Sequence, residues 1–309
     1  STGAPVAAAP STRRLARELG IDIAKVTPSG PGARVTAEDV RAFSQKSALP
    51  ETQKQPEAAA VEKEAVQIPE GAAPQERVLL RSVRKATAQR MATAWAQIPH
   101  VSHMDSVDLT ALEHFRRKHR EKVAEQGGEL SLIVFVMKAA AAALKKFPFF
   151  NSSIDMESGE IILKHYRNIG FATATERGLL VPVIREVDRK SLIELAVEFK
   201  QLSERTRQGK ASRQDLSGGT FTITNIGPFG GTAISPIINY PEAAIFGMAR
   251  AKLEPVVVGD EKDYEIVVRS MLPVSITFDH RILDGAEAAR FVNMIKGMLE
   301  DPENLLLMS

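Results

Sequence analysis

The sequence predicts a two-layer α/β domain with a mixed sheet, preceded by a much smaller helical domain. Strand and helix patterns fill residues 77–309 without the regular alternation of a doubly wound fold or a TIM barrel. Two short helix patterns stand apart in residues 10–45, and residues 46–76 contain few large apolar side chains. These observations divide the chain into a linker remnant at 1–9, a helical domain at 10–45, a flexible linker at 46–76 and a large domain at 77–309.

The composition is that of an ordinary soluble globular chain, and it excludes several kinds of chemistry. Of 309 residues, 44% are apolar and 25% charged, and the net charge of +2 gives no reason to expect nucleic acid as a partner. Cysteine is absent, which excludes disulfides, thiolate metal sites and a cysteine nucleophile. The longest apolar segment, residues 130–144, carries Lys138 and is too short to cross a bilayer, so we expect a buried helix and no membrane.

The small domain and the linker differ sharply in what they can bury. Helices are predicted at 11–20 and 36–43, joined by a loop rich in glycine and proline, and about 35 residues is near the lower limit for a core without metal or disulfide. Residues 46–76 are mostly Ala, Pro, Glu, Gln and Lys, so they are predicted to be a flexible tether that gives the small domain reach. The chain opens at Ser1 without Met, and we expect an upstream part to be missing.

The elements of the large domain are predicted from periodicity and capping residues. Capping boxes are expected at Thr110 with Glu113 and at Asp284 with Glu287. In chain order we predict a helix at 82–96, a strand at 98–108, a charged helix from 110, the buried helix at 130–144, strands at 170–175 and 179–184, an amphipathic helix at 191–207, and strands at 219–226, 243–249 and 266–278. A final helix follows Asp284 and ends near Glu300.

His280 is the best catalytic candidate among six histidines, because it falls in the short turn between a strand end and a helix start. His100 and His103 are expected on opposite faces of a strand and therefore not on a shared metal. The other three lie in polar or basic stretches, at positions 114, 119 and 165. On chemistry alone a lone histidine beside a strand end is more often structural than catalytic, and Asp284 is accounted for equally well as a helix cap.

A resemblance changes that balance. The segment Phe278-Asp-His-Arg-Ile-Leu-Asp-Gly285 resembles the signature of the dihydrolipoamide acyltransferases, which form the cores of 2-oxo-acid dehydrogenase complexes, and of the related chloramphenicol acetyltransferases. Further blocks resemble that family in the same order, among them Ile98-Pro-His-Val, Phe149-Phe-Asn-Ser-Ser and Thr220-Phe-Thr-Ile-Thr-Asn-Ile-Gly227. The resemblance implies a chloramphenicol-acetyltransferase-like domain, a homotrimer with active sites between neighbouring subunits, and assembly of trimers into a hollow cubic or dodecahedral core.

The resemblance also implies roles for individual residues. His280 would take the proton from the thiol of coenzyme A, or in reverse of dihydrolipoamide, while that sulfur attacks an acyl thioester. Thr224, where many members of the family have Ser, would donate a hydrogen bond to the tetrahedral oxyanion. Asp284 would orient the turn, with Arg84 as its ion-pair candidate. Coenzyme A is then a substrate, the lipoyl group belongs to a domain outside these residues, and neither metal nor protein nucleophile takes part.

Residues 10–45 resemble the peripheral subunit-binding domain of the same family, which holds dihydrolipoamide dehydrogenase or the 2-oxo-acid decarboxylase. Position by position, the arginines that pair with acidic groups of the partner correspond to Arg13, Arg17 and Arg34. Arg13 and Arg17 are four residues apart and share one helix face. The alternative is that all three are solvated surface charges, which contribute little in isolation.

The blocks around residues 98 and 149 favour the pyruvate enzyme and so acetyl transfer. Branched-chain acyl transfer is the alternative within the family, and a non-catalytic scaffold that tethers the dehydrogenase is the alternative from another class. Such scaffolds lose the active-site histidine, whereas this chain keeps His280. The apolar end Leu305-Leu-Leu-Met308 resembles the anchor between trimers. A bacterial cytoplasm is the favoured location, with the mitochondrial matrix expected for a eukaryotic source.

Overall fold

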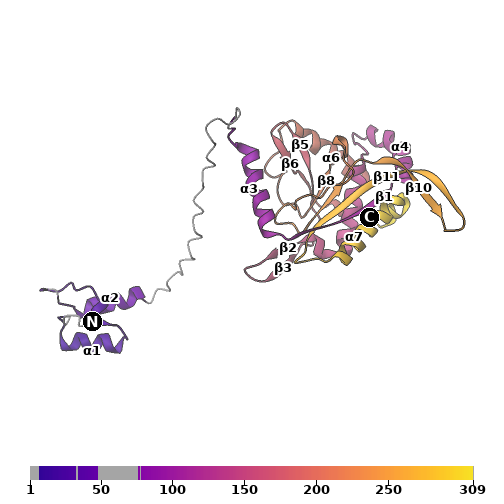
Figure 1. Cartoon of the computed structure of the whole chain (residues 1–309). Coiled ribbons are helices and arrows are strands. Elements are labelled where there is room, and N and C mark those ends of the chain that lie inside the picture. The colour runs from indigo at the N-terminus through magenta and orange to yellow at the C-terminus, as the bar shows by residue number, and fades with distance from the viewer. Residues whose placement is uncertain (1–6, 33, 48–75, 77, 309) are drawn as a thin grey trace, which may run out of the picture. The chain divides into compact units, whose positions relative to one another are not determined.

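The computed structural model describes residues 7–32, 34–47, 76 and 78–308, in two compact units divided after Arg77 (Figure 1). The predicted linker at 46–76 lies almost entirely outside the described residues, as does most of the predicted remnant at 1–9. Within the described part, no helix is both long and apolar enough to cross a membrane.

The first unit is a pair of helices around a very small core. Helix α1 spans Pro10–Glu18 and α2 spans Ala37–Ser47, with a short 3-10 helix, η1, at Ile23–Lys25. The chain leaves α1 through Gly20, whose positive φ of 65° suits a residue without Cβ. Four side chains fill the core, Ala16, Val26, Val35 and Val40.

A polar junction takes the place of a larger core in this unit. The Asp39 carboxylate accepts hydrogen bonds from the Ser29 hydroxyl at 2.6 Å and from the Thr36 backbone N–H at 2.9 Å. These bonds, that of Ser29 first, hold the pKa of Asp39 well below its usual range. The loop between the helices is therefore fixed to the start of α2.

The second unit is built on a mixed sheet of seven strands. Its order is β1-β11-β9-β8-β4-β7, with β10 also paired to β11, and β8 runs parallel to both β4 and β9 while the other pairs are antiparallel. The strands of this sheet are β1 (His100–Asp108), β4 (Ile169–Phe171), β7 (Val183–Ile184), β8 (Phe221–Asn225), β9 (Ala244–Met248), β10 (Lys252–Gly259) and β11 (Tyr264–Asp279). Two hairpins stand outside it, β2–β3 (Ser152–Asp155, Glu160–Leu163) and β5–β6 (Thr173–Thr175, Gly178–Leu180).

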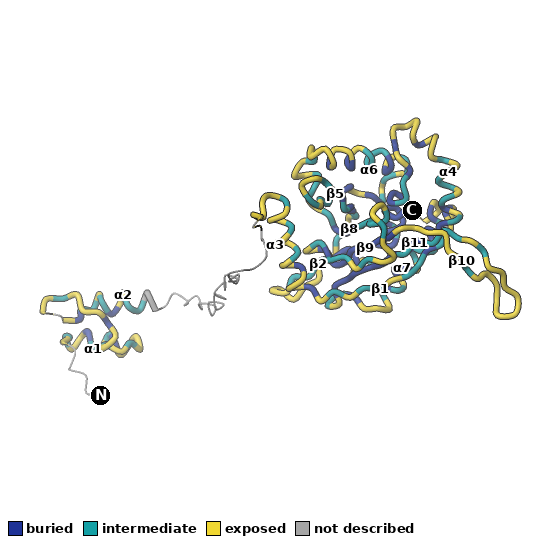
Figure 2. Tube along the Cα trace, turned by 45° about the horizontal axis from the view of Figure 1, so that its top comes forward, coloured by how far each residue is buried: buried dark blue, intermediate teal, exposed yellow. Residues whose placement is uncertain are grey.

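The helices of this unit are α3 (Ser82–Gln97), α4 (Thr110–Glu125), α5 (Leu132–Lys146), α6 (Leu192–Arg207), α7 (Gly285–Glu300) and α8 (Pro302–Met308), with short 3-10 turns η2 (Pro148–Asn151), η3 (Val187–Arg189) and η4 (Gly227–Phe229). Helices α4 to α8 form the second layer, whereas α3 packs through Ala94 in a separate small cluster with Ile98, Ile238 and Ile245. The expected two-layer α/β domain with a mixed sheet is confirmed. Buried residues concentrate where the helices face the sheet, and the β10–β11 ribbon extends beyond the body as an exposed arm (Figure 2).

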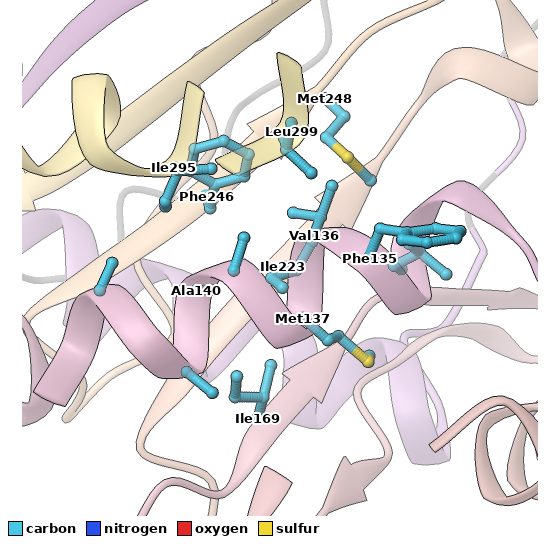
Figure 3. Packing of buried hydrophobic residues seen from close by; sticks show 14 of the residues in the cluster. Phe135, Val136, Met137, Ala140, Ile169, Ile223, Phe246, Met248, Ile295 and Leu299 are labelled. Atoms are coloured by element: carbon cyan, nitrogen blue, oxygen red, sulfur yellow. The ribbon is translucent and has the colours of Figure 1, made fainter. Parts of the chain in front are cut away.

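Helix α5 is the centre of the core. Figure 3 shows its side chains, among them Val136 and Met137, surrounded by residues of the sheet such as Phe246 and of α7 such as Leu299. An apolar helix of this kind is buried on nearly all sides, as its sequence predicts. Its one buried cation, Lys138, donates to the carbonyl of Lys190 at 2.6 Å, and burial lowers the pKa of that ammonium group.

The structure differs from the predicted elements in several places. The predicted strands at 170–175 and 179–184 are each broken in two, so that β4 and β7 belong to the large sheet while β5 and β6 form a separate hairpin. The capping box expected at Thr110 is wrong, because the Thr110 hydroxyl donates to the Asp108 carboxylate and Leu109 stands at the N-cap without a side-chain bond. The hairpin β2–β3 was not predicted, and neither was β10, whose Pro255 suits only an edge strand. Its partner β11 is accordingly longer than the predicted strand at 266–278.

Candidate active site

His280 lies at the end of β11, on a turn held from inside by its neighbours. The Asp279 carboxylate is buried and accepts two hydrogen bonds from the Arg281 guanidinium, from Nε at 2.9 Å and from Nη2 at 2.6 Å. The Arg281 backbone N–H also donates to this carboxylate, at 3.0 Å. The side-chain hydrogen bonds to Asp279 raise the pKa of the Arg281 guanidinium above its ordinary value. A charge-assisted, bidentate pair of this kind fixes the chain on both sides of the histidine.

The backbone of the turn is bound to two other segments. The His280 N–H donates to the carbonyl of Pro99 at 3.1 Å, and the Asp279 N–H donates to the carbonyl of Ala243 at 2.9 Å. The His280 ring lies 5.8 Å from the ring of Phe278, and its side chain is exposed. The imidazole is therefore presented to solvent from a rigid backbone, an arrangement suited to proton transfer with a bound substrate.

Asp284 is the N-cap of α7, and the predicted capping box is confirmed. Its Oδ1 accepts from the Glu287 N–H at 2.8 Å, while the Glu287 carboxylate accepts from the Asp284 N–H at 3.1 Å. The side chain is exposed, four residues after His280. Asp284 therefore fixes where the helix begins and so how the turn ends.

Thr224 lies far from His280 within one chain. It stands opposite Gly247 on β9, and Gly247 stands opposite Ser275 on β11, so Thr224 is level with a residue five positions before His280. Five residues of strand and two strand spacings correspond to roughly 20 Å. A single chain does not bring the proposed oxyanion donor and the proposed base together.

Arg84 is not brought to Asp284 either. Arg84 is exposed on α3, and its side chain lies beside Gly178 of β6. The Arg84 Cγ is 4.0 Å from the position that a Cβ atom on Gly178 would occupy. No ion pair between Arg84 and Asp284 occurs among the described residues. The ion pair at the site is that of Asp279 and Arg281, which the sequence analysis missed. The signal was present in the sequence, because two opposite charges flank the histidine directly behind an apolar strand.

A cavity of about 330 Å³ opens beside Asn225, the residue after Thr224. It lies between α5, α6, the β5–β6 hairpin and the turn after β8, and its walls include Phe171, Phe199 and Phe229. Lys200 and Arg207 of α6 also line it, with Glu129 and Glu204 as acidic counterparts. Among the described residues no cluster of three histidines or carboxylates is arranged to hold a metal ion.

Two family models match the chain. Residues 72–307 match the 2-oxoacid dehydrogenases acyltransferase catalytic domain, and residues 6–41 match the E3-binding domain. The chain belongs to the 2-oxoacid dehydrogenase acyltransferase family. This acyltransferase is 43% identical over 305 residues to the dihydrolipoyllysine-residue acetyltransferase component of the pyruvate dehydrogenase complex of Bacillus subtilis, which covers 98% of the chain and 68% of that protein. The corresponding protein of Staphylococcus aureus is 41% identical over 310 residues, with coverage of 98% and 71%.

Solved structures agree with the family and the fold. A dihydrolipoamide acetyltransferase of Azotobacter vinelandii, studied for the role of a serine, a histidine and an asparagine in its catalytic mechanism, matches with a TM-score of 0.72 and 39% identity over 75% of this chain and 94% of that one. A probable dihydrolipoamide acetyltransferase of Listeria monocytogenes matches with a TM-score of 0.69 and 38% identity over 74% and 96%. The acyltransferase fold expected from the sequence blocks is confirmed.

In the subunit-binding unit of the acyltransferase, the three predicted partner-binding arginines occupy different settings. Arg17 on α1 and Arg34 before α2 are exposed, and Arg13 is half-buried on α1. Arg34 lies next to Val35, a core residue of this unit. The loop that carries it is tied back by the hydrogen bond from the Gly30 N–H to the Arg34 carbonyl at 3.0 Å.

Proposed function

We propose that this chain transfers an acetyl group between an S-acetyl-dihydrolipoyl group and coenzyme A, as the core component of a pyruvate dehydrogenase complex. The observation that carries the proposal is the exposed His280 imidazole on a turn fixed by Asp279, Arg281 and Pro99. The printed names of its bacterial relatives support the acetyl group as the one transferred. The thioester C–S bond of the donor breaks and a new one forms to the acceptor sulfur.

The role of His280 follows from the chemistry of thiols. A thiol with an ordinary pKa is mostly protonated at neutral pH, so attack on a thioester is faster when a base removes the proton during the step. His280 takes that proton from the attacking sulfur and returns it to the leaving thiolate. Both sulfurs belong to substrates, so direct transfer in a ternary complex needs no nucleophile from the protein.

Thr224 serves this reaction from a neighbouring subunit. Thr224 is half-buried near the end of β8, and its hydroxyl supplies one hydrogen bond to the oxyanion of the tetrahedral intermediate. The roughly 20 Å between Thr224 and His280 within one chain supports a site between two copies. A cubic core formed by a relative that matches with a TM-score of 0.72 and 39% identity supports assembly into a large particle.

Asp284 holds the turn through its cap of α7, and it exchanges no proton in this scheme. An arginine partner for it, Arg84 in our assignment, would then belong to another subunit. In the small unit, Arg13, Arg17 and Arg34 pair with acidic groups of dihydrolipoamide dehydrogenase or of the decarboxylase. The match to an E3-binding domain supports the dehydrogenase as the partner.

Complementation between two inactive variants tests the base and the subunit arrangement together. His280→Ala should reduce acetyl transfer from acetyl-coenzyme A to dihydrolipoamide by roughly two to four powers of ten, and Thr224→Ala by about two to three, with assembly intact. Particles co-assembled from equal amounts of the two variants should recover about a quarter of wild-type turnover. In a head-to-tail contact one subunit supplies Thr224 and its neighbour supplies His280, each residue is intact in half of the subunits, and both are intact at about one interface in four.

Near-normal turnover of His280→Ala would refute the general base. Absence of recovery in the mixed particles would place both residues in one subunit and refute the shared site. Isobutyryl- and succinyl-coenzyme A, assayed beside acetyl-coenzyme A with the wild-type chain, test the acyl group. Faster transfer of the isobutyryl group would assign the chain to the branched-chain enzymes.

A further inference from the structure

The ring of His100 is bonded to backbone at both nitrogens. Its Nε2 lies 3.1 Å from the backbone nitrogen of Ile238, which donates to it, and its Nδ1 lies 2.8 Å from the carbonyl oxygen of Ile98. A peptide N–H only donates and a carbonyl only accepts, so the ring is neutral with its hydrogen on Nδ1. Trp95 stacks on this ring at a centroid distance of 5.4 Å. His100 is thus held in one position and one tautomer.

The two segments that His100 joins are the two that hold the His280 turn. Ile98 precedes Pro99, whose carbonyl accepts from the His280 N–H. Ile238 lies five residues before Ala243 in the segment that leads into β9, and the Ala243 carbonyl accepts from the Asp279 N–H. In the sheet, His100 itself is paired with Asp279. The imidazole of His100 is therefore a cross-link between the two supports of the proposed base.

We propose that His100 is a positioning residue for His280, and this inference rests on the proposed function. His100 acts through the Pro99 and Ala243 carbonyls and touches no reacting atom. Ile98 is 5% exposed and Ile238 is fully buried, so loss of the ring leaves a carbonyl and an N–H in places that water reaches poorly. The segments then move apart to recover partners, and the His280 backbone moves with them.

A displaced base affects the rate of transfer more than the binding of substrates. Misplacement of a catalytic group by about 1 Å can reduce a rate by roughly a hundredfold. The described ring contacts of His100 are to Ile98, Ile238 and Trp95, so its loss acts on the position of the base and not on a group that binds substrate in this proposal. A positioning role therefore predicts a fall in kcat with little change in KM, the pattern of an interaction that matters in the transition state.

Three substitutions separate the contributions of the ring. His100→Phe keeps the volume and the stacking on Trp95 but removes both hydrogen bonds. His100→Asn places an amide N–H near the position of Nδ1 and so keeps the bond to Ile98. His100→Gln reaches the position of Nε2 and keeps an acceptor for Ile238. His114→Phe on α4 is the matched control, because that histidine is exposed on another element.

The experiment measures kcat and both KM values for acetyl transfer by assembled particles, with particle size checked by light scattering. We expect His100→Phe to lower kcat by about 10- to 100-fold, with each KM within about twofold of wild type. The Asn and Gln variants should each recover part of the rate, Asn more, because its retained bond lies next to Pro99. His114→Phe should match the wild type.

Three outcomes overturn the inference. They are a kcat of His100→Phe within about twofold of wild type, a rise in KM at unchanged kcat, and Asn and Gln variants as slow as His100→Phe. If the Phe variant fails to assemble, the order of the Asn and Gln variants decides. His280→Ala in the same assay separates this inference from the proposed function. An inactive His280→Ala beside normal His100 variants refutes only the positioning role, whereas an active His280→Ala refutes the base.

Discussion

Glu242 gives the large unit a pH dependence that a single substitution should remove. Its side chain is 4% exposed, and its Oε1 accepts from the Asn239 amide at 2.8 Å. Among the described residues its Oε2 has no hydrogen-bond partner. Burial raises the pKa of this carboxyl from its ordinary 4.5 to about 7, although hydrogen bonds from Thr222 and Asn239 and the charge of Lys164 act to lower it. The folded protein therefore holds this proton up to neutral pH.

The sign of the effect follows from which state keeps the proton. Between pH 4.5 and pH 7 the unfolded chain has released it and the folded chain has not, so the free energy of unfolding falls as the pH rises through this range. The rise of the pKa from 4.5 to about 7, at ~1.36 kcal/mol for each pKa unit, corresponds to ~3 kcal/mol of stability that is lost in full above pH 7. Most of this loss, about 2–3 kcal/mol, falls between pH 5 and pH 8.

Glu242→Gln should abolish this part of the dependence. Glutamine has nearly the shape of the protonated carboxyl, keeps an oxygen for Asn239 and cannot ionise. Relative to the wild type, the variant should gain about 2–3 kcal/mol of stability between pH 5 and pH 8. For a domain of this size that is an apparent Tm shift of roughly 5–10 °C. Thermal unfolding of both proteins at pH 5, 6, 7 and 8, at one scan rate, measures it.

Glu160→Gln is the matched control for this series, because Glu160 is exposed on β3. It should leave the difference in Tm constant across the four pH values. If the Tm difference between Glu242→Gln and the wild type is the same at pH 5 and pH 8, the carboxyl is already ionised in the folded protein, and the argument from burial fails.

Two further predictions concern the surfaces by which the chain meets other proteins. Arg17→Glu should weaken binding of dihydrolipoamide dehydrogenase by roughly tenfold or more, because a charge pair at the interface becomes a repulsion. A calorimetric titration measures this affinity, with Lys25→Glu, an exposed change in the same unit, as the control. Equal affinity of the two variants would count against the arginine face. At the C-terminus, Leu305 is 1% exposed and belongs to the core of its own chain, whereas Leu307 is 86% exposed. Leu307→Asp should therefore release free trimers in light scattering while Glu303→Asp, another exposed change on α8, should not, and an intact particle with Leu307→Asp would refute the anchor.

Features set by neighbouring residues could be predicted from the sequence. Asp284 and Glu287 form a capping box because they occupy the N-cap and N3 positions of a helix. The helix that carries Lys138 must be buried because it has no polar face to present to water. The buried row of β11, which includes Val274 and Ile276, follows in the same way from its alternation. Each of these can be inferred from residue types that lie within a few positions of one another along the chain.

Features that depend on contacts between distant residues could not be predicted from the sequence. Thr110 looks like a helix cap until its hydroxyl is seen to accept from the backbone N–H of Ser270 on β11. Glu242 looks like a surface acid after a proline until the fold closes over it. The pairing of His100 with Ile238 joins residues far apart in the sequence, so no local pattern reports it. Polar groups that the fold buries acquire their roles from the partners it brings, and the sequence does not specify those partners locally.

The separation of Thr224 from His280 shows the same limit at the level of assembly. Strand β8 runs parallel to β9, and β9 runs antiparallel to β11. The C-terminal end of β8, which carries Thr224, and the C-terminal end of β11, which carries His280, therefore point in opposite directions along the strands. A movement of loops cannot exchange the ends of strands that are bonded in register. If Thr224 and His280 serve one reaction, the strand ends that carry Thr224 in one subunit must meet the strand ends that carry His280 in another. The strand order then makes association of subunits a condition of catalysis as well as of the size of the particle.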